Sequence, residues 1–192
     1  TGGSGSGKTS VSKMLEKLGV HIIDTDVIAH EIVEPNSDCL NELVNYFGDS
    51  ILNDDKTLNR KKLASIAFSD KQKTEALSNI THKYIKAEVV KDINTTDAEL
   101  VGIDGAVIIG SNVEPLCEFI VSVIADKQSR ITRIKTRDNI TDEQAIQRIN
   151  AQNDDEFYKE NSMYIIYNNG DIAQLESDVV GLFNKIKGNS FE

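Results

Sequence analysis

The apolar residues of this chain follow two spacings in alternation: short continuous runs and helical stripes. Continuous runs typical of buried strands occur at residues 20–23, 100–104 with 107–109, 119–125 and 164–167. The first helical stripe consists of Val11, Met14, Leu15 and Leu18. Gly19 follows this stripe, as a glycine does just past a helix. Strands that alternate with helices predict an α/β fold with a parallel sheet, whose ligands bind at the carboxyl ends of the strands.

One long interval, residues 27–99, carries helical stripes and few strand signals. Its clearest stripe is Leu40, Leu43, Val44 and Phe47, and Gly48 closes it. This interval is too long for one crossover helix, so we predict a helical substrate-binding insert within a single domain of residues 1–192. The last stripe, at residues 175–186, predicts a helix that packs and carries no chemistry.

The chain opens on a phosphate-binding pattern: Gly2, four residues, then Gly7-Lys8-Thr9. Glycines let successive N–H groups converge on an anion, and the helix that follows offers its N-terminus to phosphate. Lys8 can reach the β- and γ-phosphates, and the Thr9 hydroxyl can bind Mg²⁺. The alternative is a chance Gly/Ser turn. Such a loop follows a buried strand, and no residue precedes Thr1 here, so we expect that strand to have been cut or to lie outside this numbering.

Two carboxylates, Asp24 and Asp26, follow the second apolar run. Along an extended chain, residues two apart point the same way, about 6.6 Å apart. One acid could then act as a base toward an attacking hydroxyl while the other positions Mg²⁺. The alternative is structural: Asp26 could be the N-cap of a helix that runs through Ile28 to Ile32. The nearby phosphate loop favours the functional interpretation.

Three arginines, Arg130, Arg133 and Arg137, share one helical face. Such a stripe is often a solvated surface. A kinase, however, needs cations that close over the phosphoryl group, and arginine suits this task. The sequence 141–144 is a capping box that opens a second helix. We therefore predict a lid over residues 128–160.

Composition narrows the class of protein. The formal net charge of −10 argues against a broad nucleic-acid-binding face, so phosphate must be bound by cations and amides focused on a pocket. No run reaches the about 18 apolar residues that span a bilayer, and no signal peptide is evident. The two cysteines and three histidines match no zinc spacing. We expect a cytoplasmic protein with reduced thiols and no membrane partner.

Ordered blocks of residues carry a resemblance to a known family. Residues 1–9 are similar to Thr-Gly-Gly-x-Gly-Ser-Gly-Lys-Ser/Thr, residues 23–26 to Ile-Asp-x-Asp, and residues 133–138 to Arg-x-x-x-Arg-Asp. Further similar blocks lie at residues 18–20, 33–35, 47–48, 51–52, 58–60, 80–82, 148–152 and 168–170. With these blocks the chain resembles the dephospho-CoA kinases, P-loop kinases that phosphorylate the 3′-hydroxyl of dephospho-CoA in the last step of coenzyme A biosynthesis.

The resemblance implies a fold, ligands and residue roles. The fold would be a P-loop NTPase-type parallel sheet flanked by helices, with a CoA-binding helical subdomain and a lid. ATP phosphates and Mg²⁺ would be bound by Gly3, Gly5, Ser6, Gly7, Lys8, Thr9 and Ser10. Asp26 would be the base toward the 3′-hydroxyl, and Asp24 its partner near the metal. Arg133 and Arg137 would clamp phosphates from the lid, while Arg60 and His82 are candidates for binding dephospho-CoA.

The chain departs from the family pattern at two places. Lys83 stands where the family has proline, and residues 105–113 lack the acid expected at position 110 and the glycine expected at position 112. Two alternatives therefore stay open beside an active dephospho-CoA kinase: another nucleoside or nucleotide kinase of this fold, and a catalytically weakened CoA-binding homologue. A GTPase switch would need an Asn-Lys-x-Asp string, which the chain lacks.

Overall fold

The computed structural model describes residues 1–189, whose contacts group them into two compact units: residues 1–23 with 96 onward, and residues 24–95. Helices predominate, so the chain is a mixed α/β protein that is mostly helical. The first unit contains α1 (Lys8–Lys17), β1 (His21–Asp24, which ends at the unit boundary), β2 (Val101–Asp104), η2 (Glu114–Leu116), β3 (Val121–Ile124), α6 (Lys127–Asp138), α7 (Asp142–Asn150), α8 (Asp155–Glu160), β4 (Tyr164–Tyr167) and α9 (Ile172–Asn189). The second contains α2 (Thr25–Glu31), α3 (Asp38–Phe47), η1 (Asp49–Ile51), α4 (Arg60–Ala67) and α5 (Lys71–Thr95).

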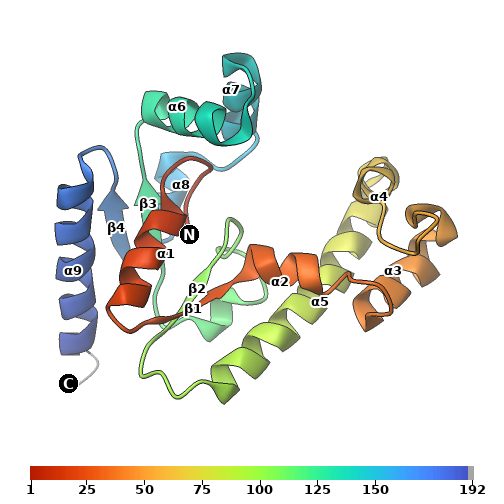
Figure 1. Cartoon of the computed structure of the whole chain (residues 1–192), viewed down its shortest axis with the longest axis horizontal. Coiled ribbons are helices and arrows are strands. Elements are labelled where there is room, and N and C mark those ends of the chain that lie inside the picture. Colours follow the sequence, from red (N-terminus) through yellow and green to blue (C-terminus); the bar gives the residue numbers. More distant parts are fainter. Residues whose placement is uncertain (190–192) are drawn as a thin grey trace. The chain divides into compact units, whose positions relative to one another are not determined.

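The core of the first unit joins helices α1 and α9 to strands β3 and β4. Helix α9 packs on both α1 and β4 (Figure 1). Val11 of α1, Val123 of β3, Ile166 of β4 and Val179 of α9 belong to one buried cluster. The predicted first and last helices are therefore confirmed, and so is the apolar stripe that starts at Val11. This cluster matters for the site because α1 carries the end of the phosphate loop.

The strands pair two by two. β1 pairs with β2, and β3 runs parallel to β4 with Val121 opposite Tyr164. Thr1 lies on the other edge of β3, since its nitrogen donates to the Val121 carbonyl at 2.8 Å and its carbonyl accepts from the Val123 nitrogen at 2.9 Å. The described strands thus form two small sheets where the pattern predicted one sheet. Thr1 is a single residue beside β3, which makes too few ladder bonds to count as a strand.

The apolar stretch at residues 107–109 is not a strand, contrary to the prediction. Turn hydrogen bonds use its backbone groups: the Ile108 carbonyl accepts from the Ser111 nitrogen at 3.0 Å. The Glu114 carboxylate accepts from the Gly110 nitrogen at 2.6 Å. Ile108 is nevertheless buried, while Val107 is exposed. One residue of this apolar run, Ile108, is thus buried although the run forms a turn. The apolar pattern alone cannot distinguish such a turn from a strand.

In the second unit, α5 contacts α2, α3 and α4 (Figure 1). The Ser37 hydroxyl caps α3 by accepting from the Leu40 nitrogen at 3.2 Å. Gly48 ends α3 with a φ of 84°, a conformation that a side chain would strain. Leu43 and Val89 are fully buried in this unit. The predicted α3 stripe and its glycine stop are confirmed. Within residues 1–189, no helix combines the length and apolarity required to cross a membrane.

The packing of α9 predicts that two neighbouring valines contribute differently to the free energy of unfolding. Val179 is 0% exposed and Val180 is 43% exposed. Val179→Ala should lower the free energy of unfolding by about 2 kcal/mol, because it removes two buried methyl groups and leaves a cavity. Val180→Ala should change it by less than about 0.5 kcal/mol. Urea unfolding of both variants measures the difference, and equal effects would contradict the packing described for α9.

Candidate active site

The phosphate loop bends through three glycines and ends at the start of α1. The φ angles of Gly2, Gly5 and Gly7 are 141°, 75° and 103°, which L-residues with a side chain rarely adopt. Gly7 is the N-cap of α1, and no side chain caps the helix. An anion can take the place of a side-chain cap at this helix N-terminus, and the helix dipole favours it there.

The carbonyl oxygens in the first half of the loop accept hydrogen bonds from the protein. The Lys8 ammonium donates to the Gly2 carbonyl at 2.8 Å, and the Ser6 nitrogen donates to the Gly3 carbonyl at 3.1 Å. The Ser4 carbonyl accepts from Arg130 Nε at 2.9 Å. Since the N–H and C=O of a peptide point in opposite directions, the bonded carbonyls of Ser4 and Ser6 turn the Gly5 and Gly7 N–H groups away from those donors.

Arg133 and Asn168 hold the second half of the loop. Arg133 Nη1 donates to the carbonyls of Gly5 at 3.2 Å and Ser6 at 3.3 Å. Its Nη2 donates to the backbone and side-chain oxygens of Asn168 at 3.0 and 3.3 Å. Asn168 Nδ2 in turn donates to the Ser6 carbonyl at 2.8 Å. Asn168 directly follows β4 and is buried, so the carboxyl end of this strand supports the loop.

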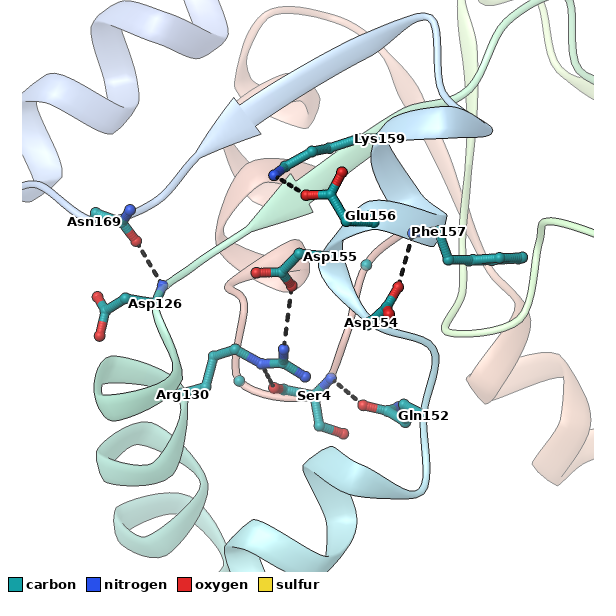
Figure 2. Close-up of polar contacts among 12 residues, drawn as sticks. Ser4, Asp126, Arg130, Gln152, Asp154, Asp155, Glu156, Phe157, Lys159 and Asn169 are labelled. Atoms are coloured by element: carbon teal, nitrogen blue, oxygen red, sulfur yellow. Dashed lines mark hydrogen bonds and ion pairs between the residues drawn. The ribbon is translucent and has the colours of Figure 1, made fainter.

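The start of α6 is itself fixed by two polar contacts. The Asp126 carboxylate caps the helix by accepting from the Ser129 nitrogen at 2.9 Å. The Asp126 nitrogen donates to the side chain of Asn169 at 2.8 Å (Figure 2). Hydrogen bonds from Ser129 hold the pKa of Asp126 below its ordinary value, so the cap stays ionised at neutral pH. These contacts set the position from which the arginines of α6 extend.

The three arginines of α6 differ in their surroundings. Arg130 is buried, Arg133 contacts the loop, and the Arg137 side chain is 62% exposed and bonds Asp138. The solvated-stripe alternative is therefore wrong for Arg130 and Arg133. The predicted role of Arg133 and Arg137 at the phosphates stays a prediction.

Helix α7 follows as expected from its capping box. The Thr141 hydroxyl accepts from the Gln144 nitrogen, and the Gln144 side chain accepts from the Thr141 nitrogen. α6 and α7 then pack through a buried apolar cluster of Ile131, Ile134, Ala145 and Ile149. The two helices predicted within residues 128–160 are confirmed, and their role as a lid stays a prediction.

The two acids after β1 lie at the start of the second unit. Asp24 Oδ1 accepts from the nitrogens of Asp26 at 2.8 Å and Val27 at 3.1 Å, so Asp24 is the N-cap of α2. The alternative that Asp26 caps the helix is wrong, because Asp26 stands in its first turn. The expectation that both acids extend along one strand is also wrong, because β1 ends at Asp24 and helix begins at Thr25.

Other predicted substrate residues also lie in the second unit. Arg60, the first residue of α4, has its Nη2 atom 2.9 Å from Nδ1 of His30 on α2. An arginine can only donate, so the His30 ring accepts through this nitrogen. His82 lies within α5. Lys83, the departure from the family proline, donates to the Glu42 carboxylate at 2.6 Å and so has a structural partner.

Sequence reasoning left Arg130, Gln152 and Asn168 out of its site residues. Arg130 was visible as part of the arginine stripe, and the other two only as members of similar blocks. The Gln152 side chain accepts from the Ser4 nitrogen at 2.6 Å. No cluster of three or more metal-ligating side chains occurs in residues 1–189.

The geometry defines a phosphate-binding loop at a helix N-terminus, held by arginines and amides. A family model described as dephospho-CoA kinase matches residues 1–174. The chain is 33% identical over 189 residues to a dephospho-CoA kinase of Lactobacillus johnsonii, with 97% of this chain and 96% of that protein covered. It is 34% identical over 192 residues to one of Listeria monocytogenes, with 98% and 96% covered. The chain therefore belongs to the dephospho-CoA kinase family.

Two solved structures share the fold. A Thermus thermophilus protein matches with a TM-score of 0.83 at 23% identity, over 96% of this chain and 94% of that chain. A dephospho-CoA kinase from Campylobacter jejuni matches with a TM-score of 0.67 at 26% identity, over 95% and 93%. The family assignment from sequence blocks is thus confirmed along nearly the whole chain.

The buried amide of Asn168 predicts a measurable effect on stability. Asn168→Ala should lower the free energy of unfolding by about 1–3 kcal/mol, because the Ser6 carbonyl and Arg133 each lose a buried hydrogen-bond partner. Asn161→Ala is the matched control, since the Asn161 amide also donates to a backbone carbonyl, that of Phe157 at 2.8 Å, but at an exposed helix end, so the loss should be smaller, about 0.5 kcal/mol. Urea unfolding checks both, and an unaffected Asn168→Ala variant would contradict its bracing role.

The lowered pKa of Asp138 predicts that the free energy of unfolding depends on pH. Hydrogen bonds from Arg137, with the charge of Arg148 nearby, hold its pKa below the ordinary value. A depressed pKa gives stabilisation that is present above the ordinary Asp pKa of about 3.9 and is lost as pH falls through the folded-state pKa. Asp138→Asn should therefore be less stable than the wild type at pH 7. Urea midpoints of the two proteins should converge as the pH falls below about 4. A difference that stays constant down to pH 2 would contradict this assignment.

Proposed function

We propose that this protein transfers the γ-phosphoryl group of ATP to the 3′-hydroxyl of dephospho-CoA and thereby forms coenzyme A. The observation that carries the proposal is a complete phosphate loop, braced at its carbonyls from Gly2 to Ser6, within a chain that matches the dephospho-CoA kinase family over residues 1–174. A braced loop supplies inward N–H groups, which is what a nucleoside triphosphate requires.

In this proposal the loop and lid bind the nucleotide. The backbone of Gly3, Gly5, Ser6, Gly7 and Ser10 surrounds the phosphates, and Lys8 neutralises the γ-phosphate. Mg²⁺ would be held by the Thr9 hydroxyl together with phosphate oxygens, with Asp24 as a candidate further ligand. These are the hard oxygen donors that Mg²⁺ prefers, and the ion would offset charge on the transferring group. Arg133 and Arg137 stabilise the charge that develops during transfer.

The acceptor side is assigned to the second unit. Asp26 is the proposed base toward the ribose hydroxyl. The hydrogen bonds that Asp24 accepts from the Asp26 and Val27 nitrogens hold the first turn of α2, which carries Asp26. Arg60 and His82 are proposed to bind dephospho-CoA, within a helical substrate region of residues 27–99. The finer fold is then a P-loop kinase core with this insert and a lid over residues 128–160.

Two alternatives stand beside this proposal: a kinase of the same fold for another nucleoside or nucleotide, and a CoA-binding homologue with weakened activity, which the departure at residues 105–113 suggests. Incubation with Mg-ATP and dephospho-CoA, with CoA followed by mass, separates them. Formation of CoA supports the proposal. Phosphorylation of a nucleoside without CoA formation favours the first alternative, and dephospho-CoA binding without turnover favours the second.

The role of Asp26 gives a prediction about turnover. Asp26→Asn should lower kcat by about 10²–10⁴-fold, because the amide cannot accept the hydroxyl proton, while the affinity for Mg-ATP is retained. Glu31→Gln is the matched control, since it removes an exposed carboxylate from the same helix and should leave kcat unchanged. Steady-state assays and ATP-binding calorimetry measure both quantities. Full turnover by Asp26→Asn would remove Asp26 from the mechanism.

A further inference from the structure

Arg130 is a buried arginine directly behind the phosphate loop, and phosphoryl transfer as described above does not use it. The residue is 5% exposed. Its one carboxylate contact in the described residues is long, with Nη1 3.5 Å from Asp155 Oδ1 (Figure 2). Its Nη2 atom is buried and has no hydrogen-bond partner among residues 1–189. A buried guanidinium with one long carboxylate contact and one unbonded nitrogen lowers the free energy of unfolding. The stability of the fold therefore does not explain why an arginine stands at this position.

Arg130 and Gln152 each bond one of the two peptide units that flank Ser4. Arg130 Nε donates to the Ser4 carbonyl at 2.9 Å, and the Gln152 side chain accepts from the Ser4 nitrogen at 2.6 Å (Figure 2). Gln152 lies in the segment that joins α7 to α8, and Asp155 is the first residue of α8. The outer turn of the phosphate loop is therefore held by α6 and by this segment of the predicted lid.

Gly3 provides the space that the guanidinium occupies. A Cβ atom on Gly3 would lie 2.3 Å from Arg130 Nη2 and 2.8 Å from its Cζ. Gly3 has no left-handed φ angle, so its backbone conformation does not itself demand glycine. The absence of a side chain at this position is explained by close packing of the loop on Arg130.

We propose that Arg130 is a positioning residue for ATP, an inference that rests on the proposed kinase function. Its guanidinium holds the Ser4 peptide, so that the loop keeps its N–H groups directed at the phosphates. Its charge, buried behind the loop, adds positive potential on a chain whose formal net charge is −10. Arg130 acts on the nucleotide and leaves the binding of dephospho-CoA unaffected.

Three substitutions of Arg130 separate the effect of its hydrogen-bond geometry from the effect of its charge. Arg130→Lys keeps the charge and loses the planar donor group, Arg130→Gln keeps a donor and loses the charge, and Arg130→Met loses both. Calorimetry should show the Kd for Mg-ATP raised about tenfold or more by Arg130→Met, with smaller increases for the other two. The KM for ATP should rise in parallel, while the KM for dephospho-CoA stays within about twofold of the wild type.

Lys159→Gln is the control for loss of a nearby cation. Lys159 lies on α8, and its ammonium donates to the Glu156 carboxylate at 2.7 Å (Figure 2). Its substitution should leave the affinity for Mg-ATP unchanged. An unchanged ATP affinity in folded Arg130→Met, or equal increases in the KM of both substrates, overturns the proposal. Circular dichroism establishes that each variant is folded.

A double-mutant cycle tests the contact itself. Gly3→Ala should weaken ATP binding in the wild type, because the new methyl group displaces the guanidinium from Ser4. In the Arg130→Gln background, whose side chain is shorter, the same substitution should weaken binding much less. Additive effects overturn the proposal. Because calorimetry reads ATP binding without an acceptor, a chain that binds ATP through Arg130 but forms no CoA would refute the proposed function and leave this inference standing.

Discussion

The site depends on one constraint: a loop that presents its N–H groups to an anion must place its carbonyl oxygens elsewhere. From Gly2 to Ser6, each carbonyl accepts a hydrogen bond from the protein. Most of the donors belong to side chains, and two of these side chains extend from α6. The architecture of the first unit serves this arrangement. The apolar cluster around Val123 and Val179 holds β3, β4 and the helices, and the ends of those strands place α6 and Asn168 beside the loop.

Much of the fold could be predicted because burial and capping leave local patterns. The α7 capping box and the glycine stop of α3 are encoded within four residues, so no distant contact is needed to read them. The N-cap of α2 was placed wrongly because Asp24 and Asp26 are both competent caps. The choice between them depends on where β1 ends, and β1 is held by its pairing with β2, a contact about eighty residues along the chain. The strand predicted at residues 107–109 was wrong for a similar reason, since a buried side chain such as Ile108 gives the same local pattern in a turn as in a strand.

The sequence predicted the phosphate loop and the arginine stripe, but it did not predict which side chains support the loop. Helical spacing put Arg130, Arg133 and Arg137 on one face, but spacing does not reveal what packs on that face. The loop covers the first two and leaves the third exposed, so a single stripe contains a buried support, a loop contact and a surface ion pair. Gln152 and Asn168 carry no local signal at all. An amide that bonds a backbone group more than a hundred residues away is recognisable only once the chain is folded.

These contacts also divide α6 into two parts with different freedom. Arg130 and Arg133, in its first two turns, bond the loop carbonyls, so movement of this part away from the loop would expose buried acceptors at a cost of about 1–3 kcal/mol each. Arg137, in the last turn, bonds the neighbouring Asp138, which also pairs with Arg148 of α7. Reorientation of Arg137 uncovers no loop carbonyl. The start of α6 thus holds the loop in shape, whereas the polar contacts of its last turn are made within the pair of helices α6 and α7.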